Sequence, residues 1–401
     1  MIKGLFSHWI YNFISILVPM LMIPLLTRRL GVDNYGVLAY LQILNSACLT
    51  FADFGLCSIG PRLLANNGGD ENRRSVSLIS IHLLMVVVST IICMCLLYFS
   101  GSFSYAKIFI LSQATVFFSF FPPSYLLIHK GCQVGYGAIN SIARLAHGVF
   151  VYLYVMTPDD IWIYFLSNFA LCFFVSIALF SLLCRKGFSL FVKTDFCFFV
   201  EAINMGFSYF LKRISSLILS LGIPFLIQSF CGSRELSYYS LADKIRTLTW
   251  QVVNPVLYTF SPIIHRYSGI DKLKGENMAH KCLITVVSIT FIISSFSNLF
   301  SEEILRLIAG KSFFDGVNSW SMASLGIVPS GIVSYYMVIK LSSYKKSSVL
   351  TIKFISLSLF CLLISIFFIK SAGAYGAVSV LIMYDLLVIL LLKRNSSYNT
   401  P

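Results

Sequence analysis

Charged residues are scarce in this 401-residue chain: Asp, Glu, Lys and Arg together make up only 11% of it. A soluble protein of this length usually carries about 25% charged residues, which solvate its surface. Hydrophobic residues account for 57% of the chain, and the mean hydropathy is +0.83. This composition excludes an ordinary soluble protein, because the apolar excess needs lipid to cover it.

The sequence also lacks the motifs of common enzymes. It has no GxSxG, no Walker A sequence, no HExxH and no glycine-rich dinucleotide fingerprint. Its eleven cysteines show no spacing suited to zinc, and most lie in apolar runs, where cysteine behaves as a small hydrophobe. We therefore predict no catalytic residue, no metal site and no cofactor. The net charge of +14 comes without a long basic run, so nucleic acid is not an expected partner.

Long apolar runs recur along the whole chain. A bilayer core about 30 Å thick needs roughly 20 apolar residues per helix. The runs predict an all-α polytopic membrane protein with about twelve transmembrane helices, the first of them uncleaved because no small-residue cleavage site follows it. The predicted spans are 9–27, 37–58, 76–98, 106–128, 139–157, 161–183, 205–230, 236–263, 280–300, 318–340, 348–369 and 374–392.

The distribution of basic residues predicts the orientation. With the N-terminus inside, sixteen Lys and Arg fall on the cytoplasmic side, seven fall on the opposite side, and seven lie within or against the spans. Cytoplasmic loops of membrane proteins carry the excess of Lys and Arg. The bias therefore predicts that both termini are cytoplasmic, and the even number of helices agrees.

The longest gap between spans divides the chain nearly in half. Residues 23–40 and 223–243 share an Ile-Pro near a helix end, a short turn and a tyrosine before the next helix. Repeated halves are a common plan of secondary transporters, which bind substrate between them. We predict an N-terminal lobe of six helices (1–185), a cytoplasmic linker (186–204) and a C-terminal lobe of six helices (205–401).

Charged side chains inside the predicted spans are candidates for a transport site. A charge at the bilayer centre costs about 2.5–3.5 kcal/mol on insertion scales, so such residues usually face a bundle interior or a watery cavity. Basic residues outnumber acidic ones here, and a net positive cavity would suit an anionic group such as a diphosphate. The candidates for this cationic cavity are Arg144, Lys212, Arg213, Lys244 and Arg246.

Other interpretations stay open for some of these residues. Lys212 and Arg213 lie near a helix end, where long basic side chains can instead snorkel to the interface. Asp243 and Arg246 are three residues apart on one helix and can pair with each other. Asp243 and Asp385 either couple transport to an ion or pair with a neighbouring cation, and for Asp53 and Asp385 we favour contact with a neighbouring helix or cation over proton coupling.

Two stretches resemble a known family. The first comprises Pro24, the turn from Thr27 to Gly31, Tyr35-Gly36 and the sequence from Asp53 to Leu56, and it resembles the N-terminal signature of O-antigen flippases of the Wzx type. The segment from Leu305 to Phe314 resembles the family's stretch before the tenth helix. These are polysaccharide transporters of the multidrug/oligosaccharidyl-lipid/polysaccharide exporter superfamily. Arg28, Arg29 and Asp53 occupy motif positions of this family.

The resemblance implies a function. Such proteins have two six-helix lobes around a central cavity in the bacterial inner membrane. By alternating access they move an undecaprenyl-diphosphate-linked oligosaccharide from the cytoplasmic to the periplasmic face. The resemblance further implies contact with membrane lipid, and O-antigen polymerase and a chain-length regulator as protein partners.

Two other functions compete with this interpretation. A drug/cation antiporter of the same superfamily would use acidic cavity residues, whereas the charges within these spans are mostly basic. An O-antigen polymerase would be an enzyme of similar length, but it would carry a large basic periplasmic loop. The loops predicted on the outer side here are short.

Overall fold

The computed structural model describes residues 2–65, 71–119, 121–189, 192–340 and 347–396. Within these ranges the regular structure is helical and no strand occurs. The chain divides into two compact units, Met1–Leu217 and Ile218–Pro401. The long helix α8 (Phe196–Phe230) crosses this boundary.

Unit 1 is a helical bundle built around α1 (Ile2–Asp53). Helix α1 packs against α3 and α6, α4 packs against α7, and α6 packs against α7. Its other elements are α2 (Leu56–Ala65), α3 (Glu71–Phe99), η1 (Phe103–Tyr105), α4 (Ala106–Ser119), α5 (Ser124–His129), α6 (Gln133–Tyr154), η2 (Pro158–Asp160), α7 (Ile161–Cys184) and the first part of α8.

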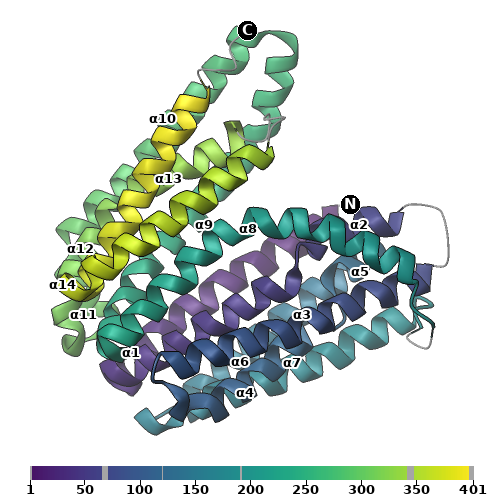
Figure 1. Ribbon diagram of the computed structural model, residues 1–401, viewed down its shortest axis with the longest axis horizontal. Coiled ribbons are helices and arrows are strands. Elements are labelled where there is room, and N and C mark those ends of the chain that lie inside the picture. Colours follow the sequence, from purple (N-terminus) through teal and green to yellow (C-terminus); the bar gives the residue numbers. More distant parts are fainter. Residues whose placement is uncertain (1, 66–70, 120, 190–191, 341–346, 397–401) are drawn as a thin grey trace. The chain divides into compact units, whose positions relative to one another are not determined.

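Unit 2 is centred on α9 (Gly232–Ile270), which packs against α10, α12 and α14. Its other elements are α10 (Lys272–Leu299), α11 (Ser301–Ala309), η3 (Lys311–Gly316), α12 (Val317–Leu325), α13 (Ile327–Tyr335), the π-helical turn η4 (Tyr336–Lys340) and α14 (Ser347–Ser396). The long helices of unit 2 run in alternating directions along the chain. Figure 1 accordingly shows α11 and the bend of α14 at one end of unit 2 and the α9–α10 turn at the other.

The predicted fold class is confirmed: the chain is an all-α, multi-pass membrane protein. Eight helical stretches of the described residues are long and apolar enough to cross a membrane. Two of these, Leu17–Leu64 and Leu350–Lys393, have 48 and 44 residues, enough for two crossings each. Helices α6 and α9 occupy the remaining predicted spans, so each of the twelve spans coincides with helical structure.

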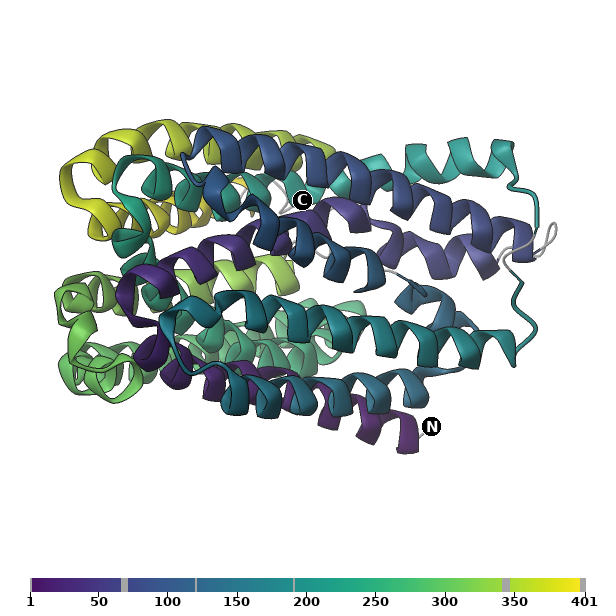
Figure 2. The same cartoon turned by 90° about the horizontal axis from the view of Figure 1, so that it is seen from below.

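Glycine explains why two predicted pairs of spans appear as single long helices. Gly31 has φ 73° inside α1, and Gly373 has φ 52° inside α14. Only glycine adopts such angles at little cost, so the helix bends sharply there without an intervening loop. In Figure 2 the purple ribbon of α1 reverses its direction at this bend. The yellow ribbon of α14 does the same.

Some predicted boundaries differ from the structure. Helix α8 begins at Phe196, whereas the sequence predicted a helix from 205, so residues 196–204 of the expected linker are helical. Glu201 and Asn204 interrupt the apolar stretch that begins at Phe196, and the predicted helix started after them. The predicted helix 106–128 is two helices, α4 and α5, because Pro122 and Pro123 interrupt it. The division into lobes at residues 186–204 stays a prediction.

Candidate functional site

Three charged side chains of unit 2 form one cluster. Arg246 of α9 donates from Nη1 to Oδ2 of Asp385 on α14 at 3.2 Å. Its Nε lies 3.3 Å from Oδ1 of Asp243, one helical turn earlier on α9. Asp385 is buried, with 6% of its surface exposed, and the other two side chains are half-buried. We call Asp243, Arg246 and Asp385 the unit 2 triad.

The unit 2 triad lies deep in the membrane-crossing part of its helices. Arg246 follows the first residue of α9 by fourteen positions, which at 1.5 Å per residue is about 21 Å. Asp385 follows the bend at Gly373 by twelve positions, or about 18 Å. Asp243 and Arg246 lie about one turn further from the helix start than the predicted span 236–263 implies, because α9 begins at Gly232.

The charges of the triad do not cancel. Two carboxylates surround one guanidinium, so the triad carries a net negative charge when all three groups are ionised. The cationic cavity stays a prediction; in unit 2 the guanidinium of Arg246 is paired with two carboxylates. Lys244 lies on the same helix, half-buried.

The second charged pair lies within unit 1. Asp53, which ends α1, forms an ion pair with Arg213 of α8. Its Oδ1 also accepts the backbone N–H of Cys57 at 3.0 Å, in the first turn of α2. Asp53 is 5% exposed, whereas the side chain of Arg213 is 43% exposed. The carboxylate of Asp53 thus joins the start of α2 to the distant helix α8. It also satisfies the backbone N–H of Cys57, which would otherwise have no partner within its helix.

The turn after α1 explains the sequence Asp-Phe-Gly at positions 53–55. Phe54 and Gly55 both have positive φ, 44° and 78°, so the helical conformation is broken between α1 and α2. A Cβ on Gly55 would lie 2.6 Å from Cβ of Tyr209 on α8. A Cβ on Gly206 would lie 2.9 Å from the carbonyl oxygen of Phe54. The motif is therefore a site of close backbone approach within unit 1.

The two arginines of the family motif have different surroundings. Arg29 donates from Nη1 to the carbonyl oxygens of Tyr152 and Val155 at 2.6 and 2.7 Å, and its guanidinium lies 5.3 Å from the ring centre of Tyr152. These carbonyls belong to the end of α6, where the last carbonyls lack partners within the helix and attract a cation. Arg28 is exposed. In this structure Arg29 therefore joins α1 to α6.

Two further predicted cations lie on helices of unit 1. Arg144 lies on α6 with an exposed side chain. Lys212 lies on α8, and its side chain is outside the described residues. The structure thus brings Arg213 to Asp53 and Arg246 to Asp243 and Asp385, each within one unit.

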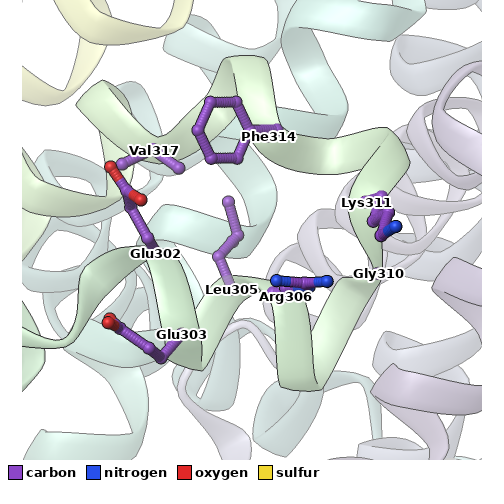
Figure 3. A pocket seen from close by; sticks show the side chains of 8 residues that line it. All are labelled: Glu302, Glu303, Leu305, Arg306, Gly310, Lys311, Phe314 and Val317. Atoms are coloured by element: carbon purple, nitrogen blue, oxygen red, sulfur yellow. The ribbon is translucent and has the colours of Figure 1, made fainter.

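Two pockets open at one end of unit 2, on either side of η3. The first, about 350 Å³, is lined by Glu302, Glu303, Leu305, Arg306, Gly310, Lys311, Phe314 and Val317 (Figure 3). The second, about 500 Å³, is lined by Glu235, Tyr238, Asp315, Asn318, Ser319, Ala372 and Tyr375. Among the described residues no group of three or more His, Cys, Asp or Glu is placed to hold a metal ion.

Sequence reasoning missed the long-range partners and the pockets. Asp53 and Arg213 are 160 residues apart, and Arg246 and Asp385 are 139 residues apart. Without an alignment, no sequence signal connects such positions. A signal for the first pocket was present, because four charged residues gather between two uncharged runs at 302–311.

Comparisons with known proteins agree with the fold. The model of a family described as polysaccharide biosynthesis protein matches residues 1–268. A protein of Escherichia coli (strain K12) described as "Putative O-antigen transporter" is 20% identical over 309 residues, which cover 75% of this chain and 74% of that protein.

Solved structures of two transporters have a similar fold. The lipid II flippase MurJ in an inward closed conformation has a TM-score of 0.72 at 14% identity, covering 99% of this chain and 88% of that one. An inward-facing multidrug resistance MATE family transporter of the MOP superfamily has a TM-score of 0.64 at 14% identity, covering 97% and 94%. At these identities the likeness concerns the fold alone.

Proposed function

The chain belongs to the polysaccharide biosynthesis protein family, and we propose that it is a flippase for lipid-linked O-antigen repeat units. Its substrate in this proposal is an undecaprenyl-diphosphate-linked oligosaccharide, carried from the cytoplasmic to the periplasmic face of the bacterial inner membrane. The protein is a transporter and not an enzyme. The name of the relative from Escherichia coli, an O-antigen transporter, supports this choice of cargo.

The observation that carries the proposal is the charge buried in membrane-crossing helices. Asp53 and Asp385 are 5% and 6% exposed, and each is paired with an arginine. Charge at this depth is costly, and in membrane proteins it typically marks a substrate or ion pathway. In a chain of this family, such arginines are suited to exchange a carboxylate for a diphosphate oxygen, because guanidinium binds both groups in the same bidentate way.

The proposed roles of the candidate residues differ with their surroundings. Arg144 on α6 and Lys244 on α9 supply positive charge that attracts the anionic head. Arg213 and Arg246 bind the diphosphate only after their ion pairs with Asp53 and Asp385 break. The exchange would then couple substrate binding to a change of conformation in alternating access. Lys212, next to Arg213, adds positive charge to the same part of α8.

Both termini are cytoplasmic in this proposal, and O-antigen polymerase and a chain-length regulator act on the product at the outer face. Reporter fusions test the orientation. A phosphatase that is active only in the periplasm should be inactive when fused after residue 396. The same reporter should be active when inserted in the α8–α9 turn at Cys231.

Complementation in the native strain tests the function. Deletion of the gene should remove the O-antigen ladder of lipopolysaccharide and leave undecaprenyl-linked repeat units on the cytoplasmic side, and a plasmid copy should restore the ladder. A triple variant, Arg144→Ala, Lys244→Ala and Arg246→Ala, should fail to restore it. Lys274→Ala is the matched control, because Lys274 is an exposed cation of α10 in an i,i+3 pair with Asp271.

The other outcomes are informative. A ladder that persists in the deletion strain would contradict the choice of O-antigen and favour another polysaccharide or a drug/cation antiporter. A lipopolysaccharide core carrying a single repeat unit would instead indicate a polymerase. Restoration by the triple variant at wild-type levels would disprove the assigned residue roles.

A further inference from the structure

The segment that forms the first pocket, 302–317, lies between two uncharged stretches. Residues 282–299 of α10 contain no Asp, Glu, Lys or Arg, and their eighteen residues span about 27 Å, close to the thickness of the bilayer core. Residues 317–339, which begin at α12, are also uncharged. Helix α11 and η3 therefore lie where the hydrocarbon ends and the lipid headgroups begin.

The charges around this pocket are separated by sign. Figure 3 shows Glu302 and Glu303 on one side of the pocket and Arg306 and Lys311 toward the other, with Leu305 and Phe314 between them. This separation follows from the chain, since the two acids belong to the first turn of α11 and the two cations to its last turn and to η3. The pocket thus presents an anionic and a cationic half across an apolar floor.

These four charges are available to a ligand. Among the residues that the structure describes, none of the four takes part in an ion pair, although Glu302 and Arg306 have the i,i+4 spacing that favours one. All four residues are exposed.

Large exposed apolar side chains occur within this segment and directly before it in the sequence. Leu299 is 78% exposed and Leu307 is 72% exposed, while Phe300 and Phe314 are 45% and 56% exposed. So much exposed apolar surface beside charged groups is typical of a segment that lies in the membrane interface, with apolar side chains among acyl chains. A ligand of the pocket would therefore meet both a charged site and lipid-like surroundings.

We propose that the pocket formed by α11 and η3 binds the headgroup of a zwitterionic phospholipid with a primary ammonium, such as phosphatidylethanolamine. Arg306 and Lys311 bind the phosphate, and Glu302 and Glu303 accept hydrogen bonds from the ammonium. The volume of about 350 Å³ lies within the range of small-molecule sites. The exposed Leu307 and Phe314 contact the acyl chains. The site is distinct from the two charged clusters described above.

The proposal discriminates between lipid classes. A quaternary ammonium has no N–H, so phosphatidylcholine cannot donate hydrogen bonds to the two carboxylates. Phosphatidylglycerol has no cation, so its headgroup would leave the carboxylates facing a phosphate of like charge. Binding should therefore be strongest for phosphatidylethanolamine.

Lipid retention by the purified full chain tests the proposal. The protein is equilibrated in detergent micelles with equal amounts of the three lipids, and the lipids that stay bound are counted by native mass spectrometry. Wild type should retain phosphatidylethanolamine in preference to the others. A double variant, Glu302→Gln and Glu303→Gln, should bind it about fivefold more weakly, because each exposed ion pair contributes a fraction of a factor of ten.

Two controls keep the result specific. Glu276→Gln removes an exposed carboxylate of α10 at the opposite end of unit 2 and should leave retention unchanged. A second double variant, Arg306→Gln and Lys311→Gln, should weaken phosphatidylethanolamine and phosphatidylglycerol alike. Size-exclusion chromatography of every variant checks that the fold is intact.

Three results would overturn the proposal. Equal retention of phosphatidylcholine would show that the carboxylates accept no hydrogen bond from the ammonium. Preferred retention of phosphatidylglycerol would indicate a simple anion site. Unchanged retention by the first double variant would show that the lipid binds elsewhere. None of these outcomes bears on whether the protein flips a lipid-linked oligosaccharide.

Discussion

Each unit of the protein buries aspartate against arginine, but the two clusters are built differently. In unit 1 a single carboxylate, Asp53, meets Arg213 and also accepts the backbone N–H of Cys57 at a turn between helices. In unit 2 two carboxylates, Asp243 and Asp385, share Arg246 between two long helices. The first arrangement balances its charge and stabilises a turn. The arrangement in unit 2 has one uncompensated negative charge, which a cation or a proton can neutralise. It also joins α9 to α14 deep in the membrane.

The comparison predicts that the largest loss of stability comes from removing Arg246. Arg246→Ala leaves Asp385, which is 6% exposed, without its cation, and breaking a buried ion pair costs about 3–5 kcal/mol. The free energy of unfolding, measured by titration with a denaturing detergent in mixed micelles, should fall by this amount. Arg246→Lys keeps the charge and should lose much less. A loss below about 1 kcal/mol for the alanine variant would mean that water reaches the triad.

Gly55→Ala should have the next largest effect and lower the free energy of unfolding by about 3 kcal/mol. The alanine would be strained by the positive φ, and its Cβ would overpack against Tyr209. The matched control is Gly101→Ala in the same unit. Gly101 also has positive φ, 71°, but a Cβ there would have nothing within 4 Å. The control should therefore lose only about 1 kcal/mol. Equal losses in the two variants would show that the turn does not pack tightly against α8.

Asp53→Asn should cost less than the loss of Arg246, about 1–2 kcal/mol. The amide oxygen still accepts the N–H of Cys57, and the 43% exposed side chain of Arg213 turns to water. Asp53→Ala removes both interactions and should cost more than Asp53→Asn in the same titration. If Asp53→Asn destabilised the protein as much as Arg246→Ala, the contrast between the two clusters would be wrong.

The smallest effect is expected at the surface of unit 2. Arg234 and Asp315 form an ion pair of 3.1 Å, but their side chains are 58% and 65% exposed. Asp315→Asn should therefore change the free energy of unfolding by about 0.5 kcal/mol or less. High salt should remove even this difference, because exposed pairs are screened. A larger loss would indicate that the pocket beside η3 stabilises unit 2 through Asp315.

Much of the fold could be predicted from the sequence, because apolar runs of about twenty residues specify membrane-crossing helices directly. Each of the twelve predicted spans coincides with helical structure. The exceptions are places where a local feature overrides the pattern. At Gly31 and at Gly373 two predicted spans are joined by a bend without a loop, and α8 starts nine residues before its predicted span 205–230.

Less of the site could be predicted. The i,i+3 spacing of Asp243 and Arg246 is a local signal, and the two residues do pair. The partners Asp53–Arg213 and Arg246–Asp385 depend on how distant helices pack, which the composition of each helix does not specify. The number of basic residues therefore suggested a cationic cavity, whereas Arg213 and Arg246 are paired with carboxylates. The roles of all five in substrate binding stay predictions.

Translocation of the lipid-linked repeat unit across a reconstituted membrane tests whether the protein is a flippase. Liposomes containing the purified protein and undecaprenyl-diphosphate-linked repeat units from the native strain are treated with a membrane-impermeant enzyme that cuts the glycan. We expect the inner-leaflet pool to become accessible over time in the presence of the protein, and far more slowly with the variant Arg144→Ala, Lys244→Ala and Arg246→Ala. Cleavage that stops at the outer-leaflet pool, as in liposomes without protein, would contradict the account.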